Sequence, residues 1–171
     1  MKKSARFPVF FAAALSLWLA WAGGLPALEE SVFLAGVNFE TPLNRLCDLA
    51  EGSPEDRQAL LEEDKIYLLL GAVTDRFYLE TENGEFRGEL ILTQGEWLGQ
   101  EEVKIYRAAI LFEGPRFEGL IPPPGRRSRT AAARNIPLNA GVLAAAKLTG
   151  FREEQGRLIP VLKGIEIRLI S

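Results

Sequence analysis

The segment "YLETENGEFRGELIL", residues 78–92, contains two runs of strand-forming residues that meet at Asn83-Gly84. An Asn-Gly pair between alternating apolar residues strongly favours a β-hairpin with a tight turn. The run before the pair, residues 66–81, is long for one strand and contains Gly71, which favours a bend or bulge. After the pair, Phe86, Gly88, Leu90 and Leu92 alternate with mostly polar residues. This segment therefore predicts a bent strand that continues into a second, half-buried strand.

More strand-like segments follow along the chain. Residues 103–113 place Tyr106, Ala108, Ile110 and Phe112 on one face, and residues 141–170 predict a second hairpin turning near Glu154-Gln155-Gly156. Between them lie a Pro- and Gly-rich loop and a helix-prone stretch near residues 128–134. Five strands with a helix between the third and fourth are typical of a small OB-like Greek-key barrel. The same alternation would also fit another small antiparallel barrel or sandwich.

Two short helices are expected before the strands. Thr41-Pro42 and Ser53-Pro54 each place a capping residue before a proline at the first helical position, which predicts helices over 42–50 and 54–63. Their apolar faces are narrow, so they should pack on a larger structure. The fold class is therefore mainly β: a five-stranded OB-like barrel over residues 65–171, preceded by an extension over residues 28–64 with two helices.

Residues 1–27 have the pattern of a secretory signal peptide: a basic start, an apolar run and a small-residue end. Cleavage could follow Ala22 or Ala27, and an uncleaved membrane anchor is the alternative. Cleavage after Ala27 would remove three cations and no acid, which changes the formal net charge from −3 to −6. We expect an exported protein, periplasmic or extracellular, without the basic surface of a general polyanion binder.

The stretch "ENGEFRGELILTQGEWLG", residues 82–99, resembles bacterial periplasmic OB-fold proteins, which consist of a signal peptide and one OB domain. The resemblance covers a minor part of the chain, and the N-terminal helices and the longer loop before the fourth strand depart from that pattern. It implies a non-catalytic periplasmic binding or stress-related role, and it assigns no functional residue.

Catalytic and metal-binding chemistry has little support in the sequence. The chain has no histidine, which removes the usual general base and the usual zinc ligand. Its single cysteine, Cys47, lies on the same helical face as Leu43, Leu46 and Ala50, so we interpret it as a buried structural thiol. The acidic runs lack the spacing of a calcium loop. We therefore expect no enzyme, no cofactor and no metal site.

Two features are candidates for ligand binding. The first is the arginine-rich stretch "RRSRTAAAR", which contains Arg126, Arg127, Arg129 and Arg134 and could bind phosphate or carboxylate groups. The alternative for this stretch is a solvated loop.

The second candidate is Trp97, between Gly95 and Gly99 in the segment joining the second and third strands. Trp97 could be a stacking platform for a ligand, but we favour a buried plug at one barrel end, because an exposed tryptophan is uncommon. Two other aromatic residues, Phe77 and Tyr106, are expected in the core.

These observations predict a non-catalytic exported OB-like domain that binds an unidentified protein, peptide or glycan. An oligonucleotide-binding OB domain is the alternative, and we expect nucleic acid to be an unlikely partner because of the acidic charge and the export signal.

Overall fold

The computed structural model describes residues 36–79, 85–121 and 135–170. All described residues belong to one compact unit, Gly36–Ser171. The predicted signal peptide, the Asn83-Gly84 turn and the arginine-rich stretch lie outside the described residues. None of the described helices has the length and apolar character needed to cross a bilayer.

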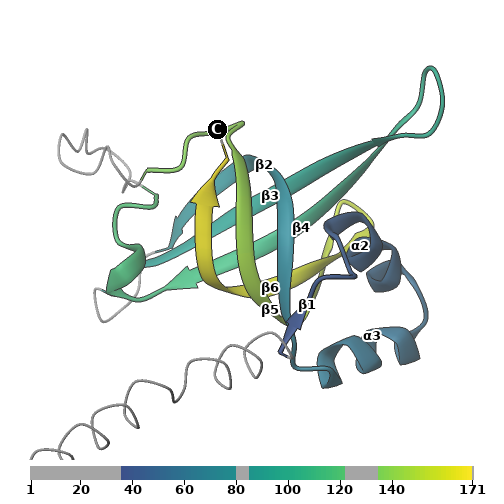
Figure 1. The fold of residues 1–171 in the computed structure, drawn as a ribbon, viewed down its shortest axis with the longest axis horizontal. Helices are drawn as coiled ribbons and strands as arrows, with labels where there is room; N and C mark the ends of the chain where they lie inside the picture. Colours follow the sequence, from purple (N-terminus) through teal and green to yellow (C-terminus); the bar gives the residue numbers. More distant parts are fainter. Residues whose placement is uncertain (1–35, 80–84, 122–134, 171) are drawn as a thin grey trace, which may run out of the picture. The chain divides into compact units, whose positions relative to one another are not determined.

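The described unit is mainly β, with six strands in one sheet and two α-helices (Figure 1). Its elements are β1 (Val37–Asn38), α2 (Leu43–Glu51), α3 (Pro54–Glu62), β2 (Ile66–Leu79), β3 (Arg87–Trp97), β4 (Val103–Glu113), the 3₁₀ turn η2 (Pro115–Phe117), β5 (Gly141–Glu154) and β6 (Arg157–Leu169). The five predicted strands correspond to β2 to β6, and the two-residue β1 is a sixth that the sequence did not indicate.

The sheet has the order β1-β2-β3-β4-β6-β5, and β2 also pairs with β5. β2 can serve both neighbours because it changes partner along its length: Ile66–Ala72 pair with β5, and Ala72–Leu79 pair with β3. The change occurs beside Gly71, where the sequence predicted a bend. β4 and β6 run parallel, whereas the other pairs among β2 to β6 are antiparallel. This strand arrangement is OB-like.

The core lies inside this curved sheet. The predicted inward faces of β3 and β4 are confirmed: Phe86 just before β3, Leu90 and Leu92 on β3, and Tyr106, Ala108, Ile110 and Phe112 on β4 are all buried. Phe77 was wrongly predicted to be in the core, because its side chain is 47% exposed. The cause is a register irregularity between Val73 and Asp75, which reverses the inward and outward positions in the second half of β2.

The two helices begin and end within one residue of the predicted positions. α2 buries its predicted face, Leu43, Leu46, Cys47 and Ala50, whereas α3 buries only Leu60. Ser53 caps α3 as expected, since its hydroxyl accepts a hydrogen bond from the Asp56 backbone N–H at 3.1 Å and the Asp56 carboxylate accepts from the Ser53 backbone N–H. The Thr41 cap is a wrong prediction: Pro42 occupies the N-cap position of α2, without a side-chain cap.

Candidate functional site

The hairpin of β3 and β4 extends beyond the strands on either side of it (Figure 1). β2 pairs with β3 no further than Thr93, and β6 pairs with β4 only from Ala109 onward. Between these points the two strands pair only with each other. We call residues Gly95–Ile105 the distal hairpin. It presents two faces, because side chains alternate along each strand.

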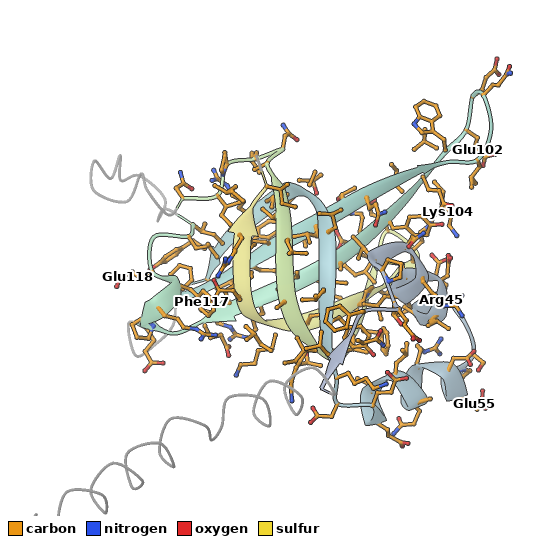
Figure 2. All side chains as sticks on the ribbon, in the orientation of Figure 1. Arg45, Glu55, Glu102, Lys104, Phe117 and Glu118 are labelled. Carbon is orange, nitrogen blue, oxygen red and sulfur yellow. The ribbon has the colours of Figure 1, made fainter. Side chains whose placement is uncertain are left out.

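The inner face of the distal hairpin is polar and forms hydrogen bonds with side chains of α2. The Glu96 carboxylate accepts hydrogen bonds from Tyr106 Oη at 2.9 Å and from Asn44 Nδ2 at 3.3 Å. On the neighbouring strand, Lys104 Nζ donates to Asp48 Oδ1 at 2.6 Å, and Figure 2 shows Lys104 next to α2. Burial and the hydrogen bond to Glu96 raise the pKa of Tyr106 above its ordinary value. These contacts hold the base of the projecting hairpin in a fixed position against the helix.

The outer face of the distal hairpin is apolar and open. Trp97 is paired with Val103 and Gly95 with Ile105, so all four residues share this face. The exposed fractions are 71% for Trp97, 38% for Val103 and 45% for Ile105. A methyl group at Gly95 would meet Val103 Cγ1 at 3.3 Å and Ile105 Cδ1 at 3.7 Å, so these two side chains lie over the glycine. The favoured plug role of Trp97 is therefore wrong, and its ring is accessible as a platform.

Toward the middle of the sheet, the apolar residues of the same outer face are buried and the charged residues are paired. A small cluster of Ile91, Ala109 and Ile159 is buried there. Charged side chains lie beside it and are already paired. Arg152 makes two hydrogen bonds of 3.0 Å to the Glu89 carboxylate, and Arg107 forms ion pairs with Glu154 at 2.9 Å and Asp75 at 3.3 Å. The distal hairpin is consequently the open part of this face.

A cavity of about 340 Å³ lies beside the distal hairpin, between α2, β4 and the turn joining β5 to β6. The turn forms at the predicted place, with Gln155 and Gly156 both at positive φ and Glu154 paired with Arg157 across it. Cations and acids both line the cavity: Lys104, Arg107, Arg157, Glu51 and Glu154. Cys47 is also part of the lining, but burial raises the pKa of its thiol to about 12, which argues against a nucleophile.

A second cavity of about 420 Å³ lies between η2 and the end of β6. Arg116 lines it, donates a hydrogen bond to the Ile165 carbonyl at 2.6 Å and lies 4.4 Å from the centre of the Phe117 ring. Phe117 is itself buried. This cavity therefore presents no open aromatic surface comparable with Trp97 among the described residues.

Some of the predicted site residues lie in the described part of the chain and others do not. Trp97 is described and exposed, whereas Arg126, Arg127, Arg129 and Arg134 lie outside the described residues. Sequence reasoning missed Val103, Ile105 and Arg157, although the alternation of residues 103–106 was a signal that could have placed Val103 and Ile105 opposite Tyr106. Within the described part of the chain, no group of three or more His, Cys, Asp or Glu side chains could hold a metal ion.

The fold and this site define an OB-like β-domain with a projecting aromatic hairpin. No protein-family model matches the sequence, and no curated protein matches it either. Among solved structures, a small single-stranded DNA-binding protein from Streptomyces coelicolor matches with a TM-score of 0.38 and 17% identity, over 63% of this chain and 93% of the other. The N-terminal domain of PriB protein from Thermoanaerobacter tencongensis, whose structure is dimeric, matches with a TM-score of 0.37 and 15% identity, over 62% and 96%.

These matches correct the predicted function and partners. We expected a secreted module for a protein, peptide or glycan and considered nucleic acid unlikely. The two structures named above are of a single-stranded DNA-binding protein and of a PriB domain, and the main prediction is withdrawn in favour of the oligonucleotide-binding alternative, which is taken up as a proposal. The resemblance to periplasmic OB-fold proteins and the export signal stay predictions.

Proposed function

We propose that this protein is a non-catalytic, five-stranded OB barrel that binds single-stranded oligonucleotides on the outer face of its distal hairpin. The observation that carries the proposal is the Trp97 ring, 71% exposed beside the hydrocarbon surface of Val103 and Ile105. An exposed tryptophan next to apolar side chains is uncommon in a protein without a partner for that surface.

The shape and chemistry of this face suit unpaired bases. Every base has a flat π-face, and stacking of a base on an aromatic side chain contributes about 1–3 kcal/mol. β3 and β4 are the second and third strands of the OB-like arrangement, and that face of an OB-fold is where oligonucleotides bind. In a duplex the bases already stack on one another, so no base face is free to stack on the Trp97 ring. Single strands should therefore bind better than duplexes.

The charge distribution indicates how such binding should depend on salt. The chain carries a formal net charge of −3, and the guanidiniums of Arg107 and Arg152 are already paired with carboxylates. Affinity should therefore come mostly from stacking and little from counterion release. We expect a shallow salt dependence, unlike that of a basic DNA-binding protein.

The test is fluorescence anisotropy of a labelled thymidine oligonucleotide of about 15 nucleotides, a length within the usual site size of an OB-fold. Trp97→Ala should weaken binding about tenfold or more, and Trp97→Phe should retain part of it. Phe39→Ala is the matched control, since Phe39 is an exposed aromatic residue (62%) that follows β1 and lies outside the hairpin. Equal binding by the Trp97→Ala and Phe39→Ala variants would contradict the proposal.

A further inference from the structure

The cavity beside the distal hairpin brings a cation close to the proposed stacking face. Arg157 begins β6, and its Nη1 donates to the Ile105 carbonyl at 3.5 Å. Ile105 is the residue whose side chain lies over Gly95 on the Trp97 face. The guanidinium of Arg157 therefore lies beside the backbone of a residue whose side chain is on the outer face of the hairpin, although it comes from a distant part of the chain.

Arg157 differs from the other two cations of the cavity in how firmly it is held. Lys104 Nζ is 2.6 Å from Asp48, and Arg107 lies within 3.3 Å of both Asp75 and Glu154. For Arg157 the carboxylate contact is with Glu51 on α2, at 3.9 Å from Nε, well beyond the 2.7–2.9 Å of a charge-assisted hydrogen bond. Its side chain is 60% exposed. Arg157 is thus the cavity cation with the greatest freedom to bind a ligand.

We propose that Arg157 binds a backbone phosphate of the oligonucleotide whose bases stack on Trp97, and that Glu51 competes with this phosphate for the guanidinium. The inference rests on the proposed function, and it adds a phosphate subsite and an internal competitor supplied by α2. Arginine suits this role because its planar fork can donate two hydrogen bonds to phosphate oxygens. Glu51 lowers the affinity, because its negative charge both occupies Arg157 and repels the phosphate.

The test is the salt dependence of binding to the same labelled thymidine oligonucleotide, compared among full-length variants. Arg157→Gln should weaken binding at low salt and reduce the slope of log affinity against log salt by about 0.7, the value for one phosphate contact on a single strand. Glu51→Gln should strengthen binding about two- to fivefold, in line with the removal of one exposed ionic competitor. The matched control is Arg168→Gln, because Arg168 is an exposed arginine on β6 that pairs with Leu143 and does not line the cavity.

The results separate this inference from the proposed function. If the wild-type protein does not bind the oligonucleotide, both are wrong. If it binds through Trp97 but Arg157→Gln keeps the wild-type salt slope, or changes it no more than Arg168→Gln does, the phosphate subsite is wrong and the stacking function stands. If Glu51→Gln binds no more tightly than the wild type, the competition between Glu51 and phosphate is refuted.

Discussion

Substitution of Gly164 by alanine should test how closely β6 packs on the core. A Cβ at this position would overlap Cε1 and Cδ1 of the Phe112 ring and lie 2.8 Å from Cζ. Phe112 is fully buried and packs edge-on against Phe117, with the ring centres 4.9 Å apart. The ring therefore has little room to move away from the added methyl group.

The expected cost follows from two opposing terms. Forcing an extra methyl group into a filled core costs about 1–3 kcal/mol. Replacing glycine by alanine in a strand raises the free energy of unfolding by about 0.5–1 kcal/mol, because the unfolded chain loses conformational freedom. Since the overlap is with a buried ring and not with a flexible chain end, we expect Gly164→Ala to lower the free energy of unfolding by about 2 kcal/mol. Urea denaturation should show a lower midpoint with an unchanged slope.

Two further variants make this reasoning refutable. Gly150→Ala is the control, because Gly150 lies in β5 and no heavy atom outside itself and its two chain neighbours lies within 4 Å of its ideal Cβ, so it should be neutral or slightly stabilising. Phe112→Leu should be destabilising alone, but the double variant with Gly164→Ala should cost at least about 1 kcal/mol less than the sum of the two. Equal midpoints for Gly164→Ala and Gly150→Ala, or strictly additive costs in the double variant, would show that the ring does not limit the site.

The remaining predictions concern the helices, the thiol and the hairpin. Ser53→Ala should lower the free energy of unfolding by about 1 kcal/mol through loss of the α3 cap, and an unchanged urea midpoint would refute this. Burial raises the pKa of Cys47 from 9.0 to about 12 and that of Tyr67 from 10.0 to about 12. The unfolded chain therefore loses these protons first, and stability should fall as the pH rises from 9 toward 12, less steeply in Cys47→Ala. Equal slopes for both proteins in alkaline urea titrations would contradict this. Trp97→Ala should change the urea midpoint little, because the ring is mostly exposed, and a loss above about 1 kcal/mol would mean that the ring is packed.

Local sequence signals predicted the strands and the turn near Gln155 well because their physical causes are local. The turn at Gln155-Gly156 needs positive φ at two adjacent positions, and glycine at the second makes this possible. The inward residues of β3 and β4 follow from alternation within each strand, and the structure buries the residues that this alternation points inward: Leu90, Leu92, Tyr106, Ala108, Ile110 and Phe112. The capping box of Ser53 and Asp56 likewise depends on neighbouring residues alone.

The errors arose where tertiary structure decides. Phe77 has the same local pattern as an inward residue, but the irregularity between Val73 and Asp75 turns it outward. The exposure of Trp97 depends on how far β2 and β6 extend along their neighbours, which alternation within β3 does not indicate. Arg157 directly follows the turn between β5 and β6, and the fold places it beside Ile105 of β4. Neither of these two segments contains a sequence signal for that contact.

The most direct measurement of the central claim is the fluorescence of Trp97 during titration with a single-stranded thymidine oligonucleotide. The chain has three tryptophans, so a Trp18→Phe/Trp21→Phe background leaves Trp97 as the reporter. We predict that the free protein is readily quenched by acrylamide, that the oligonucleotide quenches the emission saturably through base stacking, and that bound oligonucleotide protects the ring from acrylamide. Emission that is unchanged by saturating oligonucleotide, with acrylamide access equal in its presence and absence, would contradict oligonucleotide binding on the distal hairpin.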